Sequence, residues 1–273
     1  MARGRTPRRA VDRHYAVRPV PEPVQSNDEA HSSGAASRSP VREAVSVWAA
    51  VMGILVAVRM AGIAIPVLHQ LVGAVAVAAF LYAPVKPLER REQDGHAAGW
   101  RFDRLGAEIA WALLACAFIL PPFTLAFWWF VRELPLVPRQ IAAWLAPYVG
   151  SAHALRFGVG PSPWGLAGRI AGNGAVAFAE EFFYRGYVTL RLEERWPPRT
   201  RILGVPLGRA AVLAAALFAV GHLLEPAPWR LAVFFPALVF AWLRRRTGTI
   251  AGAALCHFVF NVWLLLLERA AFA

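Results

Sequence analysis

Two adjacent glutamates and an arginine stand among phenylalanines in the segment AFAEEFFYRG, residues 178–187. On a helix, residues four apart share a face, whereas neighbours point about 100° apart. We therefore expect Glu181 and Arg185 to form an ion pair, while Glu180 points elsewhere, on the face of Tyr184. A carboxylate without a local partner in an apolar setting is a stronger base than one in water, which suits general acid–base hydrolysis. A purely structural ion pair would explain the same pattern.

Two later apolar runs contribute histidines. His222 ends the sequence LFAVGH, and His257 stands four residues before Asn261, so the last two share one helix face. Each feature alone is unspecific, because polar side chains commonly bond between membrane helices. An imidazole and an amide can also donate hydrogen bonds to a developing oxyanion. Since ionisable groups inside apolar runs are candidate functional sites, the three patterns are interpreted together.

The elements that carry these residues are apolar runs of about membrane-spanning length. Of the 273 residues, 58% are hydrophobic, above the about 45–50% of soluble domains, and a membrane helix needs about 20 apolar residues. The sequence predicts an all-α, polytopic membrane helical bundle of about seven transmembrane helices, the last four forming a four-helix core. The runs cover approximately residues 44–65, 67–85, 107–131, 167–190, 207–224, 229–243 and 249–267.

Basic residues between these runs indicate the orientation. The net charge is +12, and with a cytoplasmic N-terminus the basic tail and three basic loops all fall on the cytoplasmic side. This predicts a multi-pass protein of the cell inner membrane. Long apolar runs do not suit a nucleic-acid-binding groove, so the expected partner is the lipid bilayer and no nucleic acid. Arg59 interrupts the first run, and Pro121-Pro122 are expected to kink the third.

The chain is expected to have three regions. Residues 1–42 are a disordered, basic cytoplasmic tail. Residues 43–165 hold the N-terminal transmembrane helices and a Pro/Trp-containing connector, in which residues 140–150 could form an interfacial or re-entrant helix. Residues 166–273 form the four-helix core. Cys116 and Cys256 lie in apolar runs and are expected to be buried thiols, not a disulfide.

Read together as EExxxR, FxxxH and HxxxN, the three patterns resemble the CPBP family of intramembrane proteases. This family is related to the CAAX prenyl endopeptidase and to bacteriocin-processing proteins, and is also called the Abi family. The resemblance covers approximately residues 165–270. It implies an intramembrane glutamic-type endopeptidase without a cofactor. In this mechanism Glu180 and His222 would activate a water, while His257 and Asn261 would stabilise the oxyanion.

The same resemblance gives Glu181 and Arg185 a supporting role, in which they hold the helix and tune Glu180. A zinc-dependent alternative stays open, because Glu180, His222 and His257 make up a common catalytic zinc set. The metal-free mechanism is favoured. The HxxxN helix supplies only one good ligand, and the ion pair places a positive charge close to the site.

The wider sequence around these motifs resembles the myxosortases, glutamic-type sorting proteases thought to process C-terminal anchors made of a short motif, one transmembrane helix and an arginine cluster. The expected partner is therefore a membrane-anchored protein or peptide, cleaved in or near its C-terminal anchor or sorting signal. Short loops and an Arg/Ala-rich composition favour a bacterial protein and disfavour a prenylated substrate. The alternatives are a CAAX-type or bacteriocin-maturation or immunity protease, a non-catalytic membrane scaffold, and an ion or proton pathway. Against a pathway, the chain has no internal repeat.

Overall fold

The computed structural model describes residues 39–133, 138, 163–224 and 228–272. The expected tail, up to residue 38, lies outside the described residues. So does most of the Pro/Trp-containing connector, including the interfacial helix expected at 140–150.

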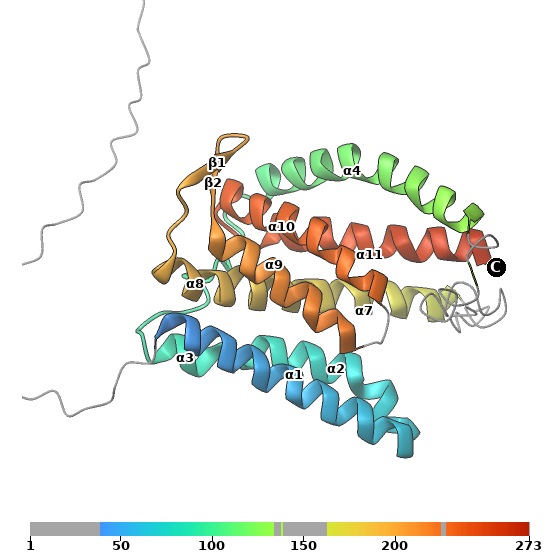
Figure 1. Cartoon of the computed structure of the whole chain (residues 1–273), viewed down its shortest axis with the longest axis horizontal. Coiled ribbons are helices and arrows are strands. Elements are labelled where there is room, and N and C mark those ends of the chain that lie inside the picture. Colours follow the sequence, from blue (N-terminus) through green and yellow to red (C-terminus); the bar gives the residue numbers. More distant parts are fainter. Residues whose placement is uncertain (1–38, 134–137, 139–162, 225–227, 273) are drawn as a thin grey trace, which may run out of the picture. The chain divides into compact units, whose positions relative to one another are not determined.

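The described part of the chain is nearly all helical (Figure 1), as the sequence predicts. Each predicted apolar run corresponds to one helix or to two or three consecutive helical segments. In chain order the elements are α1 (Pro40–Ala64), α2 (Pro66–Tyr82), α3 (Val85–Glu89), α4 (Leu105–Glu133), α7 (Pro163–Glu181), the π-helix η3 (Phe182–Val188), α8 (Thr189–Arg195), β1 (Thr200–Ile202), β2 (Val205–Leu207), α9 (Arg209–Gly221), the 3₁₀ turns η4 (His222–Leu224) and η5 (Pro228–Val233), α10 (Phe234–Thr247) and α11 (Ala251–Phe272).

The predicted four-helix core is present. The helix α11 packs against both α7 and α10, and α9 packs against α10. On one side of this group α1 and α2 pair with each other, and α2 contacts α7. On the other side α4 lies along α11 (Figure 1). The N-terminal helices therefore flank the core that carries the polar motifs.

The predicted count of seven membrane spans is not confirmed. Within the described residues, four helical segments are long and apolar enough to cross a membrane: Pro40–Ala64, Leu71–Glu89, Leu105–Glu133 and Ala251–Glu268. The helices α9 and α10 have 13 and 14 residues. At 1.5 Å per residue each is about 20 Å long, less than the about 30 Å of a bilayer core.

One local feature departs from the expected loops, and a second lies where the third run was expected to kink. The loop after α8 contains a two-stranded hairpin, β1 paired antiparallel with β2. Its turn places Leu203 and Gly204 at φ 49° and 76°, the left-handed backbone that tight hairpin turns require. The helix α4 continues through Pro121 and Pro122 and curves along its length (Figure 1).

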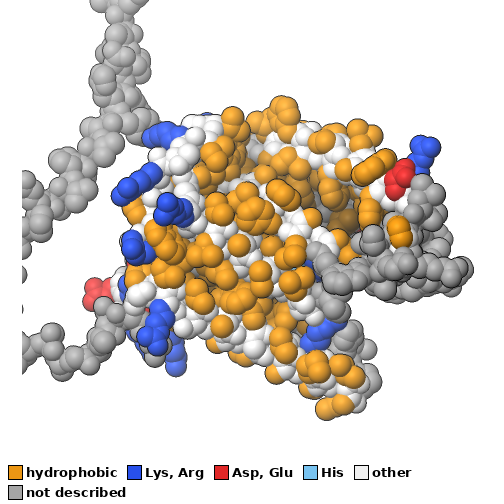
Figure 2. Space-filling model, viewed as in Figure 1, with side chains coloured by type: hydrophobic (Ala, Val, Ile, Leu, Met, Phe, Trp, Pro, Cys, Tyr) orange, Lys and Arg blue, Asp and Glu red, His pale blue; other side chains and the backbone are white. Residues whose placement is uncertain are grey.

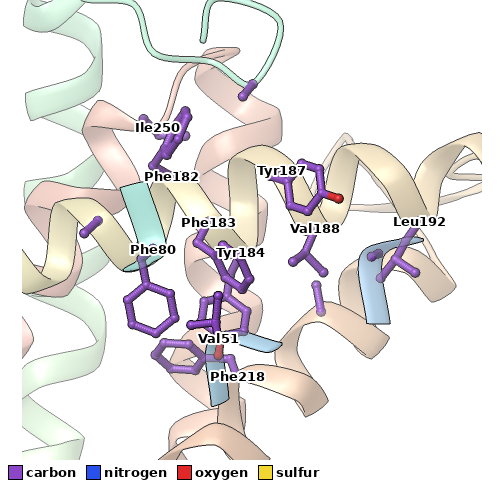
Figure 3. Packing of buried hydrophobic residues seen from close by; sticks show 14 of the residues in the cluster. Val51, Phe80, Phe182, Phe183, Tyr184, Tyr187, Val188, Leu192, Phe218 and Ile250 are labelled. Atoms are coloured by element: carbon purple, nitrogen blue, oxygen red, sulfur yellow. The ribbon is translucent and has the colours of Figure 1, made fainter. Parts of the chain in front are cut away.

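The main hydrophobic core surrounds η3, the segment that follows the two glutamates. Figure 3 shows Phe183 and Tyr184 of η3 close to Phe80 of α2 and Phe218 of α9. Every residue of η3 is buried. The aromatic side chains thus join the N-terminal helix pair to the motif-bearing helices, and they set the position of the glutamates.

Basic side chains gather at one end of the molecule. On the face seen in Figure 2 most Lys and Arg side chains lie at the left, the end that carries α3, α8 and the hairpin in Figure 1. Some of these arginines take part in ion pairs: Arg91 contacts Glu43 at 3.0 Å and Glu194 at 3.2 Å. They therefore tie α1 and α8 to the loop after α3, as well as carrying charge.

Candidate active site

The two glutamates stand at the change from α-helix to π-helix. Glu180 and Glu181 are the last residues of α7, and η3 begins at Phe182. At the end of η3 the hydroxyl of Thr189, the first residue of α8, donates to the Tyr184 carbonyl, five residues earlier, at 2.7 Å. Short π-helical turns inside α-helices frequently occur at functional sites. The irregular turn lies directly beside the predicted catalytic carboxylate.

Glu181 is held by two cationic or proton-donating groups. Its Oε1 atom accepts from Arg185 at 2.9 Å, which is the predicted ion pair, and lies 2.9 Å from Nδ1 of His257. Both glutamate and arginine are almost fully buried, at 0% and 2% side-chain exposure. The contact with His257 was not predicted. It joins α7 to α11 and fixes the orientation of the imidazole ring.

Aromatic rings enclose this ion pair. The Arg185 guanidinium lies 4.5 Å from the Phe218 ring centre and 5.2 Å from that of Phe240, and it donates to the Ala237 carbonyl at 3.1 Å. The Phe240 ring also stacks on His257, with centroids 4.8 Å apart. Such rings attract a cation while they exclude water. Arg185 is thereby positioned by α9 and α10, and His257 by α10.

Glu180 faces a different environment, as its helix phase predicts. Its Oε2 atom lies 3.6 Å from Nε2 of His257, and the residue lines a cavity of about 150 Å³ together with Tyr184 and His222. Its side chain is 13% exposed, against 0% for Glu181. One carboxylate is therefore sealed in the packing, and the other borders a space that a substrate group or water can enter.

His222 enters the cavity from the end of α9, where it caps the helix. Its Nδ1 atom lies 2.9 Å from the Phe218 carbonyl oxygen. Because a carbonyl can only accept, Nδ1 carries the proton, and in the neutral ring Nε2 is left as an acceptor. This tautomer suits an imidazole that orients a water molecule or accepts its proton.

The structure brings three of the predicted catalytic residues to one place. Glu180 and His222 share the cavity, and His257 contacts Glu180 from α11. Asn261 is half-buried on α11, four residues beyond His257. It does not line the described cavity, so its predicted oxyanion role rests on its helix position and stays a prediction.

Three further side chains with polar groups line the cavity and were not assigned to the site from the sequence. Tyr184 lies beside Glu180, and its hydroxyl accepts from the Trp48 indole at 3.2 Å. Arg59 and Arg230 also line the cavity. The signal for Arg59 was present in the sequence, since a lone arginine in an apolar run is a functional candidate by default. Arg230 is the second residue of the predicted run 229–243, and a charge at the end of a run is a weaker signal.

The residues of the alternative zinc set do not fit a metal ion as they are placed. Among the described residues no group of three or more His, Cys, Asp or Glu side chains is arranged to hold one. Both ring nitrogens of His257 face glutamate oxygens, and Nδ1 of His222 is occupied by a carbonyl. No step of the chemistry is therefore assigned to zinc.

The two cysteines lie away from this site, across the interface of α4 and α11. Cys116 and Cys256 are buried, free thiols, as predicted, and their sulfur atoms are 3.6 Å apart. On the same helix as Cys116, Glu108 is 1% exposed and accepts from the Thr249 hydroxyl at 2.6 Å. These contacts hold α4 against the start of α11.

Comparison with known proteins agrees with the motifs. Residues 163–263 match the family model for type II CAAX prenyl endopeptidase, Rce1-like. The matched segment contains every predicted site residue, and the match agrees with the resemblance to the CPBP family. No curated protein and no solved structure matches the chain. The resemblance to myxosortases is not confirmed and stays a prediction.

Proposed function

We propose that this protein is an intramembrane endopeptidase that hydrolyses a peptide bond in or near a C-terminal membrane anchor. The family of residues 163–263 supports a CAAX-type protease. The observation that carries the proposal is that Glu180 and His222, from two different helices, border one cavity within an apolar helical bundle. A third helix brings His257 to within 3.6 Å of Glu180.

In the proposed reaction Glu180 takes a proton from a water molecule, which His222 orients through Nε2. The water oxygen bonds to the carbonyl carbon of the substrate, and His257 and Asn261 donate to the oxyanion. The C–N bond then breaks, and Glu180 returns the proton to the leaving amine. In a known protease one oxyanion donor is worth about 2.7–4 kcal/mol.

The contacts of His257 set a condition on its role. Because Nδ1 already donates to Glu181, the ring can donate from Nε2 only when both nitrogens carry protons. Glu181 would therefore act as a positioning residue, which holds both Arg185 and the ring of His257. Glu180 would be the carboxylate that touches the reacting water. This division gives the two adjacent acids separate tasks.

Apolar helices of spanning length show that the protein belongs in a membrane. We infer that this is the cell inner membrane, with the N-terminus in the cytoplasm, because basic side chains gather at the end that carries α3 and α8 (Figure 2). A substrate with a single membrane helix would then reach the cavity laterally, through the bilayer. A sorting signal of the myxosortase type, with one helix and an arginine cluster, has this form.

The proposal is tested in proteoliposomes that contain the purified protein and a candidate C-terminal anchor peptide. We expect the wild type to cleave the peptide, and Glu180→Ala and His222→Ala to leave it intact. A useful control is Arg42→Ala, at the exposed start of α1. Ion flux through the wild type without any cleavage would instead favour the pathway alternative.

A further inference from the structure

An arginine from outside the family-matched segment reaches the candidate active site. Arg59 lies in α1, and between residues 44 and 64 it is the one charged residue of the sequence. Its side chain lines the cavity that Glu180 and His222 border. A charge within a membrane helix is costly and usually faces a polar interior or a pathway. Here it faces the proposed site of hydrolysis.

A second cation lines the same cavity from another element. Arg230 belongs to η5, which packs against α9, the helix that ends at His222. Arg230 and His222 both line this cavity, as Glu180 does. Both Arg59 and Arg230 are half-buried. Among the described lining residues the cavity thus has two guanidinium groups and a single carboxylate, that of Glu180.

Hydrolysis itself does not call for two guanidinium groups beside the general base. A water molecule and a peptide carbonyl are neutral, and the proposed oxyanion donors come from α11. Guanidinium groups are well suited to bind carboxylates, through paired charge-assisted hydrogen bonds. The remaining walls are largely apolar and include Met52, Leu55 and Phe80. A peptide end with apolar side chains and one carboxylate matches these walls.

We propose that Arg59 and Arg230 form a carboxylate-binding subsite, which selects substrates that carry a carboxylate close to the scissile bond. The carboxylate is either the C-terminus of the peptide or an acidic side chain. The cavity of about 150 Å³ is small, so the carboxylate lies within a short distance of the bond that is cut. The use of this selection in catalysis rests on the proposed protease function, whereas the binding of a carboxylate does not.

The binding test uses the full chain with Glu180→Gln. This variant lacks the proposed general base, so it should bind a peptide without cleaving it. The probes are two matched pairs of short apolar peptides. The first pair is one peptide as the free acid and as the C-terminal amide. The second pair is that amide with an internal Glu and with an internal Gln in its place. We expect the matching carboxylate form to bind about 10- to 100-fold more tightly than its neutral counterpart. Comparison of the two pairs shows whether the C-terminus or a side chain supplies the carboxylate.

Substitutions in the same background assign the preference to the arginines. Arg59→Gln and Arg230→Gln should each reduce it at least severalfold, and Arg59→Lys should keep part of it. Arg42→Gln, on the same helix but exposed and outside the cavity, should leave it unchanged. Equal binding of acid and neutral peptides, or a preference that survives both glutamine substitutions, overturns the subsite.

Turnover by the protein with Glu180 intact separates this inference from the proposed function. If Arg59 served only as a counterion of Glu180, Arg59→Gln would lower kcat equally for acid and amide peptides and leave the binding preference unchanged, which refutes the subsite. If the subsite is correct, kcat/KM falls for the acid peptide alone. Preferential binding without any cleavage would support the subsite and contradict the protease.

Discussion

Replacing the two adjacent glutamates one at a time should separate stability from catalysis. Glu181→Gln removes the negative charge whose Oε1 atom lies 2.9 Å from both Arg185 and His257. The side chains of this ion pair, Glu181 and Arg185, are 0% and 2% exposed. Glu180→Gln removes a carboxylate whose contact with His257 is longer, 3.6 Å, and whose side chain borders a cavity. We expect the first change to destabilise the fold and the second to abolish cleavage with little loss of stability.

The size of the effect follows from burial. Removing one partner of a buried ion pair costs about 3–5 kcal/mol, because the remaining charge is left without compensation. For a chain of this size each kcal/mol lowers the melting temperature by about 2–4 °C, so Glu181→Gln should lower it by about 6–20 °C. Glu180→Gln should cost about 1 kcal/mol or less, since it breaks no short hydrogen bond.

The assay is thermal unfolding in detergent followed by tryptophan fluorescence, together with peptide cleavage for each variant. Glu193→Gln is a matched control, because Glu193 is a partly exposed glutamate whose contact with Arg245 is 3.4 Å. It should cost about 0–1 kcal/mol. Equal destabilisation by Glu180→Gln and Glu181→Gln, or full activity in Glu180→Gln, would refute the division of roles.

Three further outcomes follow from the contacts. Cleavage should persist after exhaustive chelation with no metal bound to the purified protein, whereas loss of activity that Zn²⁺ restores would support the zinc alternative. Gly221→Ala should reduce cleavage, because the added Cβ would lie 2.9 Å from the Tyr184 hydroxyl and 3.2 Å from the Met52 sulfur. The control Gly53→Ala adds its Cβ into open space and should not reduce cleavage. Equal activities of the two variants would contradict this packing. Mild oxidation should join Cys116 to Cys256, whose sulfur atoms are 3.6 Å apart, and a non-reducing gel or thiol count that detects no internal disulfide would contradict the α4–α11 contact.

The helical class and the helix phase at the glutamates could be predicted because they depend on local periodicity. The spacing of Glu181 and Arg185 alone predicts their ion pair, and the same geometry turns Glu180 to the face of Tyr184. The position of His222 at a helix end was also predictable from the residues around it.

Contacts between distant segments could not be predicted from periodicity. The bond between His257 and Glu181 depends on how α11 packs on α7, and the stacking of Phe240 on His257 depends on α10. The number of membrane spans is not confirmed, and the difficulty is related: an apolar run indicates burial, but burial by protein and burial by lipid look alike in a sequence. The hairpin was missed because its turn, Leu203-Gly204, lacks the usual Asn-Gly or Asp-Gly signal.

The most direct test of the central claim follows the oxygen of the attacking water. Proteoliposomes with wild-type protein and an anchor peptide are incubated in H₂¹⁸O, and the products are analysed by mass spectrometry. Hydrolysis by a water activated at Glu180 predicts one new amino terminus and ¹⁸O in the new carboxylate, with neither product in Glu180→Gln. Cleavage that continues in Glu180→Gln, or products without ¹⁸O, would contradict it.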